Sequence, residues 1–147
     1  NGSSLYQFAT TPGYYYIAIV NNKVYVNDTV SSISKLNIIE SLTIGAKNMI
    51  VYSVRVRSLA LSENEIDANR ALDENRYKDK VSLSSLVGYV TKGVETWLDG
   101  YFGSMYRNIK GTNENITITL EESITTIETI KYYKNSGIDY DNSYYIH

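Results

Sequence analysis

The sequence predicts an all-β protein of antiparallel strands with one short helix, and three observations indicate this fold class. Apolar and polar residues alternate in several segments, as expected for half-buried strands. A hairpin signature lies near the amino terminus, and a helix start signal lies at Ser62. The chain also contains fifteen tyrosines but only two phenylalanines and one tryptophan, and tyrosine suits strands with one wet face because its hydroxyl can stay hydrated.

The hairpin is predicted at residues 14–26. A Pro-Gly turn signal precedes an apolar run rich in aromatic and β-branched residues at 14–20. Asn21 and Asn22 follow, and asparagine tolerates the positive φ that a two-residue hairpin turn requires. Residues 23–26 are then expected to return as the partner strand.

Residues 42–77 are predicted to couple a long strand to a capped helix. Alternation over residues 50–57 predicts one apolar face formed by Ile50, Tyr52, Val54 and Val56. It predicts a second face, mostly exposed to solvent, formed by Val51, Ser53, Arg55 and Arg57. Ser62 and Glu65 have the spacing of a capping box, so the helix is expected over residues 62–75.

Further strands are expected on both sides of this unit. Residues 37–44 form one candidate, with Gly45 as a bulge or turn after it. Residues 116–120 alternate, and Ile124, Ile127 and Ile130 follow at a spacing that a helix would also give. The threonine-rich, β-branched composition favours a strand there. The tail is expected to close with a strand at residues 144–146.

Composition argues against several function classes. The net charge of −2 does not indicate binding to nucleic acid, which favours a basic protein surface. No apolar run approaches the roughly 18 residues that a membrane span needs. The single histidine is His147 and there is no cysteine, which argues against a Ser–His–Asp triad, a Cys–His dyad and a histidine-rich zinc site. Because the chain begins at Asn1, we expect a processed product or a piece of a larger polypeptide.

Three segments resemble laminin-G-like, concanavalin A-like jelly-roll modules. YSVRVRSLALSENEI at residues 52–66 resembles the closing strand and helix of such modules, and YYYIAIVNNKVYVND at residues 14–28 resembles one of their hairpins. GVETWLDG at residues 93–100 resembles the strand with which many of them begin. The resemblance implies an antiparallel jelly-roll sandwich.

The order of these segments implies an abbreviated or permuted jelly roll. Residues 1–78 correspond to the carboxy-terminal half of a module, yet only thirteen residues precede Tyr14. Residues 79–147 would supply further strands that complete the sandwich, or would form a short second module. The first arrangement is favoured because it gives every strand a partner and leaves fewer exposed sheet edges.

The densest local mixture of aromatic, acidic and amide side chains predicts a sugar-binding site. Sugars stack their C–H faces on aromatic rings and pair their hydroxyls with polar side chains. The candidate ligand-binding residues are Trp97, Asp99, Tyr101, Tyr106 and Asn108. The alternative for Trp97 is a place in the core.

A calcium site is a weaker prediction, and no other cofactor is expected. Asp139 and Asp141 lie at positions i and i+2, which places two carboxylates on one side of an extended chain, and carboxylates are ligands that calcium prefers. The alternative is a solvated acidic turn.

The resemblance implies a non-catalytic module that meets cell-surface glycans, located in a phage tail fibre, another part of a virion or a bacterial surface protein. Two alternatives remain open. One is a purely structural virion component that packs against identical copies, as in a trimeric fibre. The other is a concanavalin A-like glycanase, which needs two acids in one groove. Glu121 and Glu122 do not meet this need, because neighbouring residues of a strand point to opposite faces.

Overall fold

A computed structural model of the chain describes residues 9–34, 41–44, 49–79, 88–93, 95–99, 116–119, 123–133, 137–138 and 144–146. Every strand pairing among these residues is antiparallel. One helical segment accompanies the strands, so the predicted antiparallel all-β fold with a single short helix is confirmed for the part of the chain that is described.

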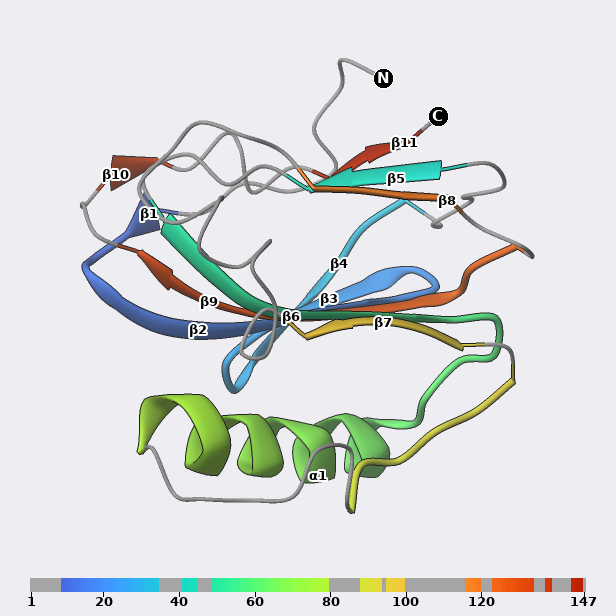
Figure 1. Cartoon of the computed structure of the whole chain (residues 1–147), viewed down its shortest axis with the longest axis horizontal. Coiled ribbons are helices and arrows are strands. Elements are labelled where there is room, and N and C mark those ends of the chain that lie inside the picture. The colour runs from blue at the N-terminus through green and yellow to red at the C-terminus, as the bar shows by residue number, and fades with distance from the viewer. Residues whose placement is uncertain are drawn as a thin grey trace.

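The largest sheet has six strands and forms the centre of the molecule (Figure 1). In spatial order these strands are β4 (Thr29–Ser32), β3 (Lys23–Val26), β2 (Gly13–Val20), β9 (Thr126–Tyr133), β6 (Met49–Arg57) and β7 (Glu95–Asp99). Strand β9 therefore lies between β2 and β6 and hydrogen-bonds to both. The sheet thus draws strands from both sides of residue 78.

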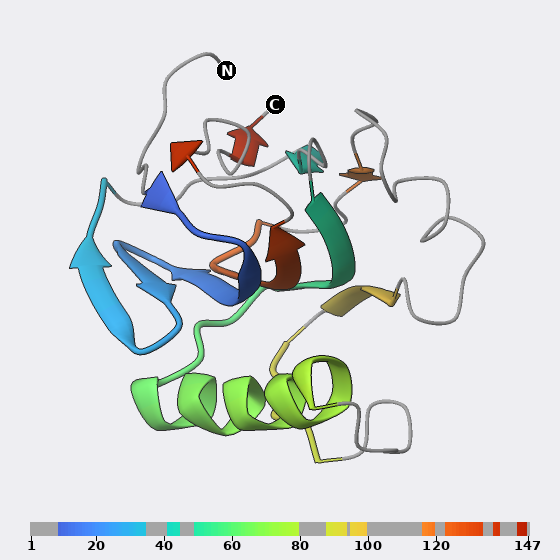
Figure 2. The same ribbon diagram turned by 90° about the vertical axis from the view of Figure 1, so that its left-hand side faces the viewer.

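The remaining strands form two smaller sheets. The three-stranded sheet has the order β11 (Tyr144–Ile146), β5 (Ser41–Ile44) and β8 (Ile116–Thr119), and β1 (Ala9–Thr10) pairs with β10 (Gly137–Ile138). Figures 1 and 2 both show the three-stranded sheet over one face of the six-stranded sheet and the helix α1 (Glu63–Asp73) over the other. The central sheet is thus covered on both faces.

The predicted hairpin is confirmed, and a second turn follows it directly. Strands β2 and β3 pair so that Val20 lies opposite Lys23, and Asn21 has a φ of 53° in the two-residue connection. Asn27 has a φ of 54° between β3 and β4. Its side-chain Oδ1 accepts a hydrogen bond from the Tyr16 N–H at 3.0 Å, which fixes this second turn against β2.

A bulge in β6 makes the predicted two faces of this strand partly wrong. The pairing with β9 shifts register between Val51 and Ser53, so Val51 shares a face with Val54 and Val56 rather than with the arginines. The prediction that the face with the two arginines is exposed to solvent is also wrong. Arg55 and Arg57 are 1% and 0% exposed, because α1 covers their side of the sheet.

The predicted helix and its capping box are confirmed. The Glu65 N–H donates to Ser62 Oγ at 3.3 Å, and the Ser62 N–H donates to Glu65 Oε1 at 2.8 Å. The helix begins at Glu63, and a π-helical turn, η1 (Glu74–Lys78), continues it slightly beyond the predicted end. The capping box thus fixes where α1 starts relative to the end of β6.

An apolar cluster joins α1 to the sheet at the amino-terminal end of the helix. It consists of Tyr16, Ala18, Val20, Tyr25, Leu61 and Ile66, all of them buried. Apolar packing of this kind is the main source of helix stability in a folded domain. The helix is therefore held at its start by the capping box and by hydrophobic contacts.

We predict that Ser62→Ala lowers the free energy of unfolding by about 1 kcal/mol, the usual cost of losing an N-cap side chain. The exposed Ser32→Ala in β4 is the control, and we expect a change within about 0.5 kcal/mol for a surface substitution. Urea unfolding followed by circular dichroism measures both variants. Equal stability of Ser62→Ala and the wild type would contradict the stabilising role of the cap.

Candidate binding groove beside the helix

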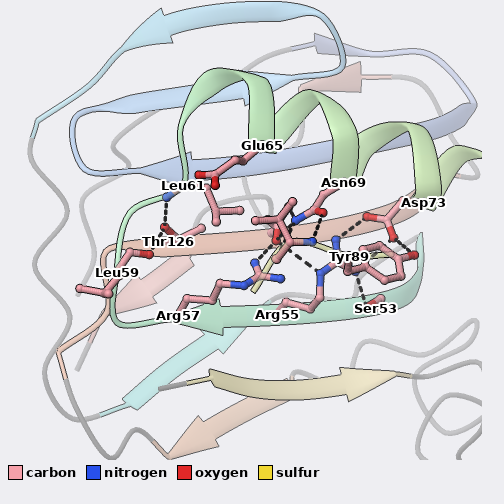
Figure 3. Close-up of polar contacts among 12 residues, drawn as sticks. Ser53, Arg55, Arg57, Leu59, Leu61, Glu65, Asn69, Asp73, Tyr89 and Thr126 are labelled. Atoms are coloured by element: carbon pink, nitrogen blue, oxygen red, sulfur yellow. Dashed lines mark hydrogen bonds and ion pairs between the residues drawn. The ribbon is translucent and has the colours of Figure 1, made fainter. Parts of the chain in front are cut away.

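A buried ion pair connects the middle of β6 to the last turn of α1. Arg55 Nη1 donates to Asp73 Oδ1 at 3.1 Å, and Arg55 Nη2 donates to Asp73 Oδ2 at 2.6 Å. Figure 3 shows Arg55 pointing from the strand towards Asp73 on the helix. Two parallel bonds between a guanidinium and a carboxylate fix both position and orientation. The pair therefore sets the distance and the rotation of α1 over the sheet.

Glu128 of β9 extends this ion pair into a network. Its carboxylate accepts hydrogen bonds from Tyr16 Oη, from Arg57 Nη1 and, at 3.0 Å, from Asn69 Nδ2. Arg55 Nε also donates to it, at 3.4 Å. One carboxylate thus joins β2, β6 and α1 to β9.

Tyr89 closes the other end of the network, in the segment that follows the helix. Its hydroxyl donates to Asp73 Oδ1 at 2.6 Å, and its ring lies under the Arg55 guanidinium at 4.5 Å from the ring centroid. A cation over an aromatic face gains further electrostatic attraction. Asp73 and Arg55 are therefore enclosed on several sides.

Burial and ion pairing act against each other on the pKa values of these groups. Burial would raise the pKa of Glu128, but the charges of Arg55 and Arg57 outweigh it and lower that pKa. Burial raises the pKa of Asp73, and Arg55 offsets this only in part. Burial would lower the pKa of Arg55, but the two carboxylates raise it well above its ordinary value. Arg55 therefore stays charged.

An open groove of about 340 Å³ lies beside this network, between the helix and the first strands of the sheet. Strand β2 and the turn before β4 form one wall, the helix forms the other, and β9 contributes one residue. The lining residues are Tyr14, Tyr16, Asn27, Asp28, Arg70, Glu74, Lys78 and Ile130. The groove combines aromatic rings, an amide and charges of both signs.

Helical spacing explains the polar wall of the groove. Arg70, Glu74 and Lys78 follow one another at intervals of four, so they share one side of the continuous α1–η1 segment. Asn69 and Asp73 each precede one of these residues and point into the buried network (Figure 3). The buried contacts of Asn69 and Asp73 therefore turn the next residues towards the groove.

Strand pairing explains the opposite wall. Tyr14 and Tyr16 are two residues apart on β2 and share a face of the sheet, and Ile130 is paired with Tyr16 across the β2–β9 ladder. Tyr16 is fully buried, and its hydroxyl donates to Glu128. Tyr14 is half-buried and is packed edge-on against Tyr132, with ring centroids 4.9 Å apart. Strand pairing and these side-chain contacts fix the position of the wall that β2 forms.

Two of the predicted sugar-binding residues are placed by the structure, away from the strands that line this groove. Trp97 and Asp99 lie on β7, where they pair with Arg55 and Ser53, at the opposite edge of the sheet from β4. Tyr101, Tyr106 and Asn108 lie outside the described residues, as do Asp139 and Asp141. The cluster around Trp97 and the calcium pair therefore stay predictions.

The described part of the chain has neither a metal-binding cluster nor a membrane-spanning helix. It contains no group of three or more histidine, cysteine or acidic residues that could hold a metal ion. No helix there is long and apolar enough to cross a membrane.

Sequence reasoning missed the groove, although two signals for it exist. Arg70, Glu74 and Lys78 repeat at helical spacing within the predicted helix and just beyond it. Asn27 and Asp28 form the turn after the predicted hairpin. What the sequence does not reveal is that this turn and this side of the helix face each other across β2.

We predict that Glu128→Gln lowers the free energy of unfolding by about 3–5 kcal/mol, because it removes one partner of buried ion pairs and leaves the arginines undercompensated. The control is Asp67→Asn, which affects an exposed carboxylate 3.7 Å from Arg70 and should cost no more than about 1 kcal/mol. Urea unfolding measures both. Similar costs for the two variants would contradict the importance of the network.

We also predict that Glu128 titrates below its ordinary pKa of 4.5 and Asp73 above its ordinary 3.8. The lowered pKa means that Glu128 stabilises the fold above pH 4.5, and that this contribution is lost as the pH falls through the folded-state value. Asp73 acts in the opposite direction, because its ionised form is disfavoured by folding. Carboxyl ¹³C NMR titration measures both groups, and a Glu128 pKa at or above 4.5 would contradict this electrostatic balance.

No protein-family model, no curated protein and no solved structure matches this chain in the comparisons made.

Proposed function

We propose that this protein is a non-catalytic recognition module that binds glycans at cell surfaces. The observation that carries the proposal is the groove beside α1, which combines the half-buried ring of Tyr14 with an amide and charged side chains. Glycans need such a mixture, because their rings present apolar C–H faces and their hydroxyls require hydrogen-bond partners. The groove is also open to solvent on one side, so a chain could continue beyond it.

The finer fold proposed is a concanavalin A-like jelly-roll sandwich in abbreviated or permuted form. It is supported by the six-stranded antiparallel sheet, which faces a three-stranded sheet on the side opposite α1. It is supported as well by β7 and β9, which come late in the sequence and pair with the earlier strand β6. A place in a virion, such as a tail fibre, or on a bacterial surface rests on the sequence resemblance.

A purely structural role in an oligomer is a second candidate, and the edge strand β4 favours it. Among the described strands β4 and β7 form the two edges of the six-stranded sheet, and Val30 on β4 is 45% exposed. Exposed sheet edges without charged residues invite pairing with another chain. A trimeric fibre component of this kind would bind no glycan.

A glycanase is a third candidate, because Asp28 and Glu74 both line the groove. Glycoside hydrolysis needs two carboxyl groups on either side of the scissile bond. Turnover would appear as release of reducing ends from a bound glycan, whereas a recognition module would leave the glycan intact.

We predict that the protein binds at least one glycan class on an array and does not hydrolyse it. Mass measurement in solution, by light scattering, is carried out on the same sample. A blank array together with a mass that is a multiple of 16.6 kDa would contradict the recognition proposal and favour the structural role. Release of reducing sugar from the bound glycan would favour the glycanase.

A further inference from the structure

We infer that the groove beside α1 holds one uncharged sugar ring of the glycan chain. This inference rests on the proposed glycan recognition and adds the place and the chemical class of the bound sugar. The groove is formed by Arg70, Glu74 and Lys78 on the helical wall and by Asn27 and Asp28 on the turn opposite.

The charges of the groove favour an uncharged ligand. Arg70 and Lys78 contribute two positive charges, and Asp28 and Glu74 contribute two negative charges, so the lining is neutral overall. Along the helical wall the signs alternate, with Glu74 between the two cations. A carboxylate or an ammonium group on the ligand would therefore meet a like charge next to its partner.

The hydrogen-bonding groups of the groove match hydroxyls. Arg70 and Lys78 offer only donors, Asp28 and Glu74 offer only acceptors when ionised, and the Asn27 amide is an additional polar group. A sugar hydroxyl donates and accepts at the same time, so neighbouring hydroxyls of one ring can use both kinds of partner. A ligand with acceptors alone, such as a phosphate, would leave the two carboxylates facing it.

The volume of the groove and its accessible tyrosine suit a single ring. About 340 Å³ lies at the small end of the range for ligand pockets, roughly 300–1,000 Å³. The half-buried ring of Tyr14 provides a surface for the C–H face of the sugar, and the buried Ile130 lies behind it. The rest of the glycan would leave through the open side of the groove.

The groove is preorganised by contacts that the ligand does not have to make. Asn27 Oδ1 accepts from the Tyr16 N–H, and the Asn27 N–H donates to the Tyr16 carbonyl oxygen at 2.9 Å. The Tyr16 hydroxyl is bound to Glu128, and the helical wall is held by the Arg55–Asp73 pair. Little conformational freedom is then lost on binding, which favours affinity for a small ligand.

The experiment is a ¹⁵N NMR titration of the intact chain with free monosaccharides. The uncharged probes are glucose, galactose, mannose and N-acetylglucosamine, and the charged probes are glucuronic acid and glucosamine. We expect at least one uncharged sugar to shift the amides of Asn27, Asp28 and Glu74, and to bind more tightly than the charged sugars. The dissociation constant should change little between low and high salt, because no ion pair with the ligand forms.

Variants at Glu74 and Lys78 test whether the groove is the site. Glu74→Leu and Lys78→Leu should each weaken binding about tenfold, because a hydrogen-bonding group is lost. Glu74→Gln should retain most of the affinity, since an amide still pairs with a hydroxyl. Glu63→Leu and Lys23→Leu are matched controls outside the groove, at an exposed pair 3.9 Å apart, and should bind as the wild type does.

The outcomes separate this inference from the proposed function. Glycan binding that is unchanged in both groove variants would overturn the inference and leave glycan recognition standing. Preference for glucuronic acid or glucosamine, or loss of affinity in Glu74→Gln equal to that in Glu74→Leu, would overturn the uncharged class. Absence of binding to every monosaccharide and to the array would overturn both. Melting curves for each variant show whether a loss of binding reflects a loss of folding.

Discussion

The contact of Arg55 with Asp73 and Glu128 is the constraint on which the helix side of this protein depends. A charged side chain buried without a partner would cost several kcal/mol, so these groups persist only where each meets an opposite charge. Arginine suits this position because its planar guanidinium binds two oxygens of one carboxylate and still has a donor for a second. The helix can therefore occupy one place over the sheet without leaving a buried charge unpaired.

We expect the network to contribute to the specificity of helix placement more than to overall stability, even though removal of one partner alone is costly. Buried ion pairs are often no more stabilising than well-packed apolar residues, because desolvation offsets the attraction. The apolar cluster around Leu61 and Ile66 supplies the hydrophobic driving force at the start of the helix. Apolar contacts are not directional, so they allow the helix to rotate or slide. The paired charges remove that freedom.

The same constraint shapes the groove. Asn69 and Asp73 are used inside the network, and Arg70 and Glu74, one residue further on, line the groove. Tyr16 belongs to both, because its hydroxyl donates to Glu128 and its ring lines the groove. A rotation of the helix that broke the network would also move the polar wall, so the shape of the groove depends on the same contacts as the position of the helix.

Short-range sequence patterns were sufficient to predict the helix and several strands. They were not sufficient to predict which side chains are buried or which segments lie side by side. The asparagine turn, the capping box and the strands at β8, β9 and β11 follow from short-range patterns and are confirmed. The bulge in β6 depends on pairing with β9, which lies more than seventy residues later in the chain. The alternation of residues in β6 predicts that Arg55 and Arg57 are exposed to solvent. They are buried because α1 lies over them. The groove likewise depends on a helix and a turn that are distant in sequence.

Native-state hydrogen exchange tests most directly whether the network makes the helix and the sheet one cooperative unit. The amides of α1 at Asn69 and Asp73 should then open with the same free energy as those of β9, which is the free energy of global unfolding. Exchange of the α1 amides through a local opening of much lower free energy, with β9 still protected, would contradict the central role of the buried ion pairs.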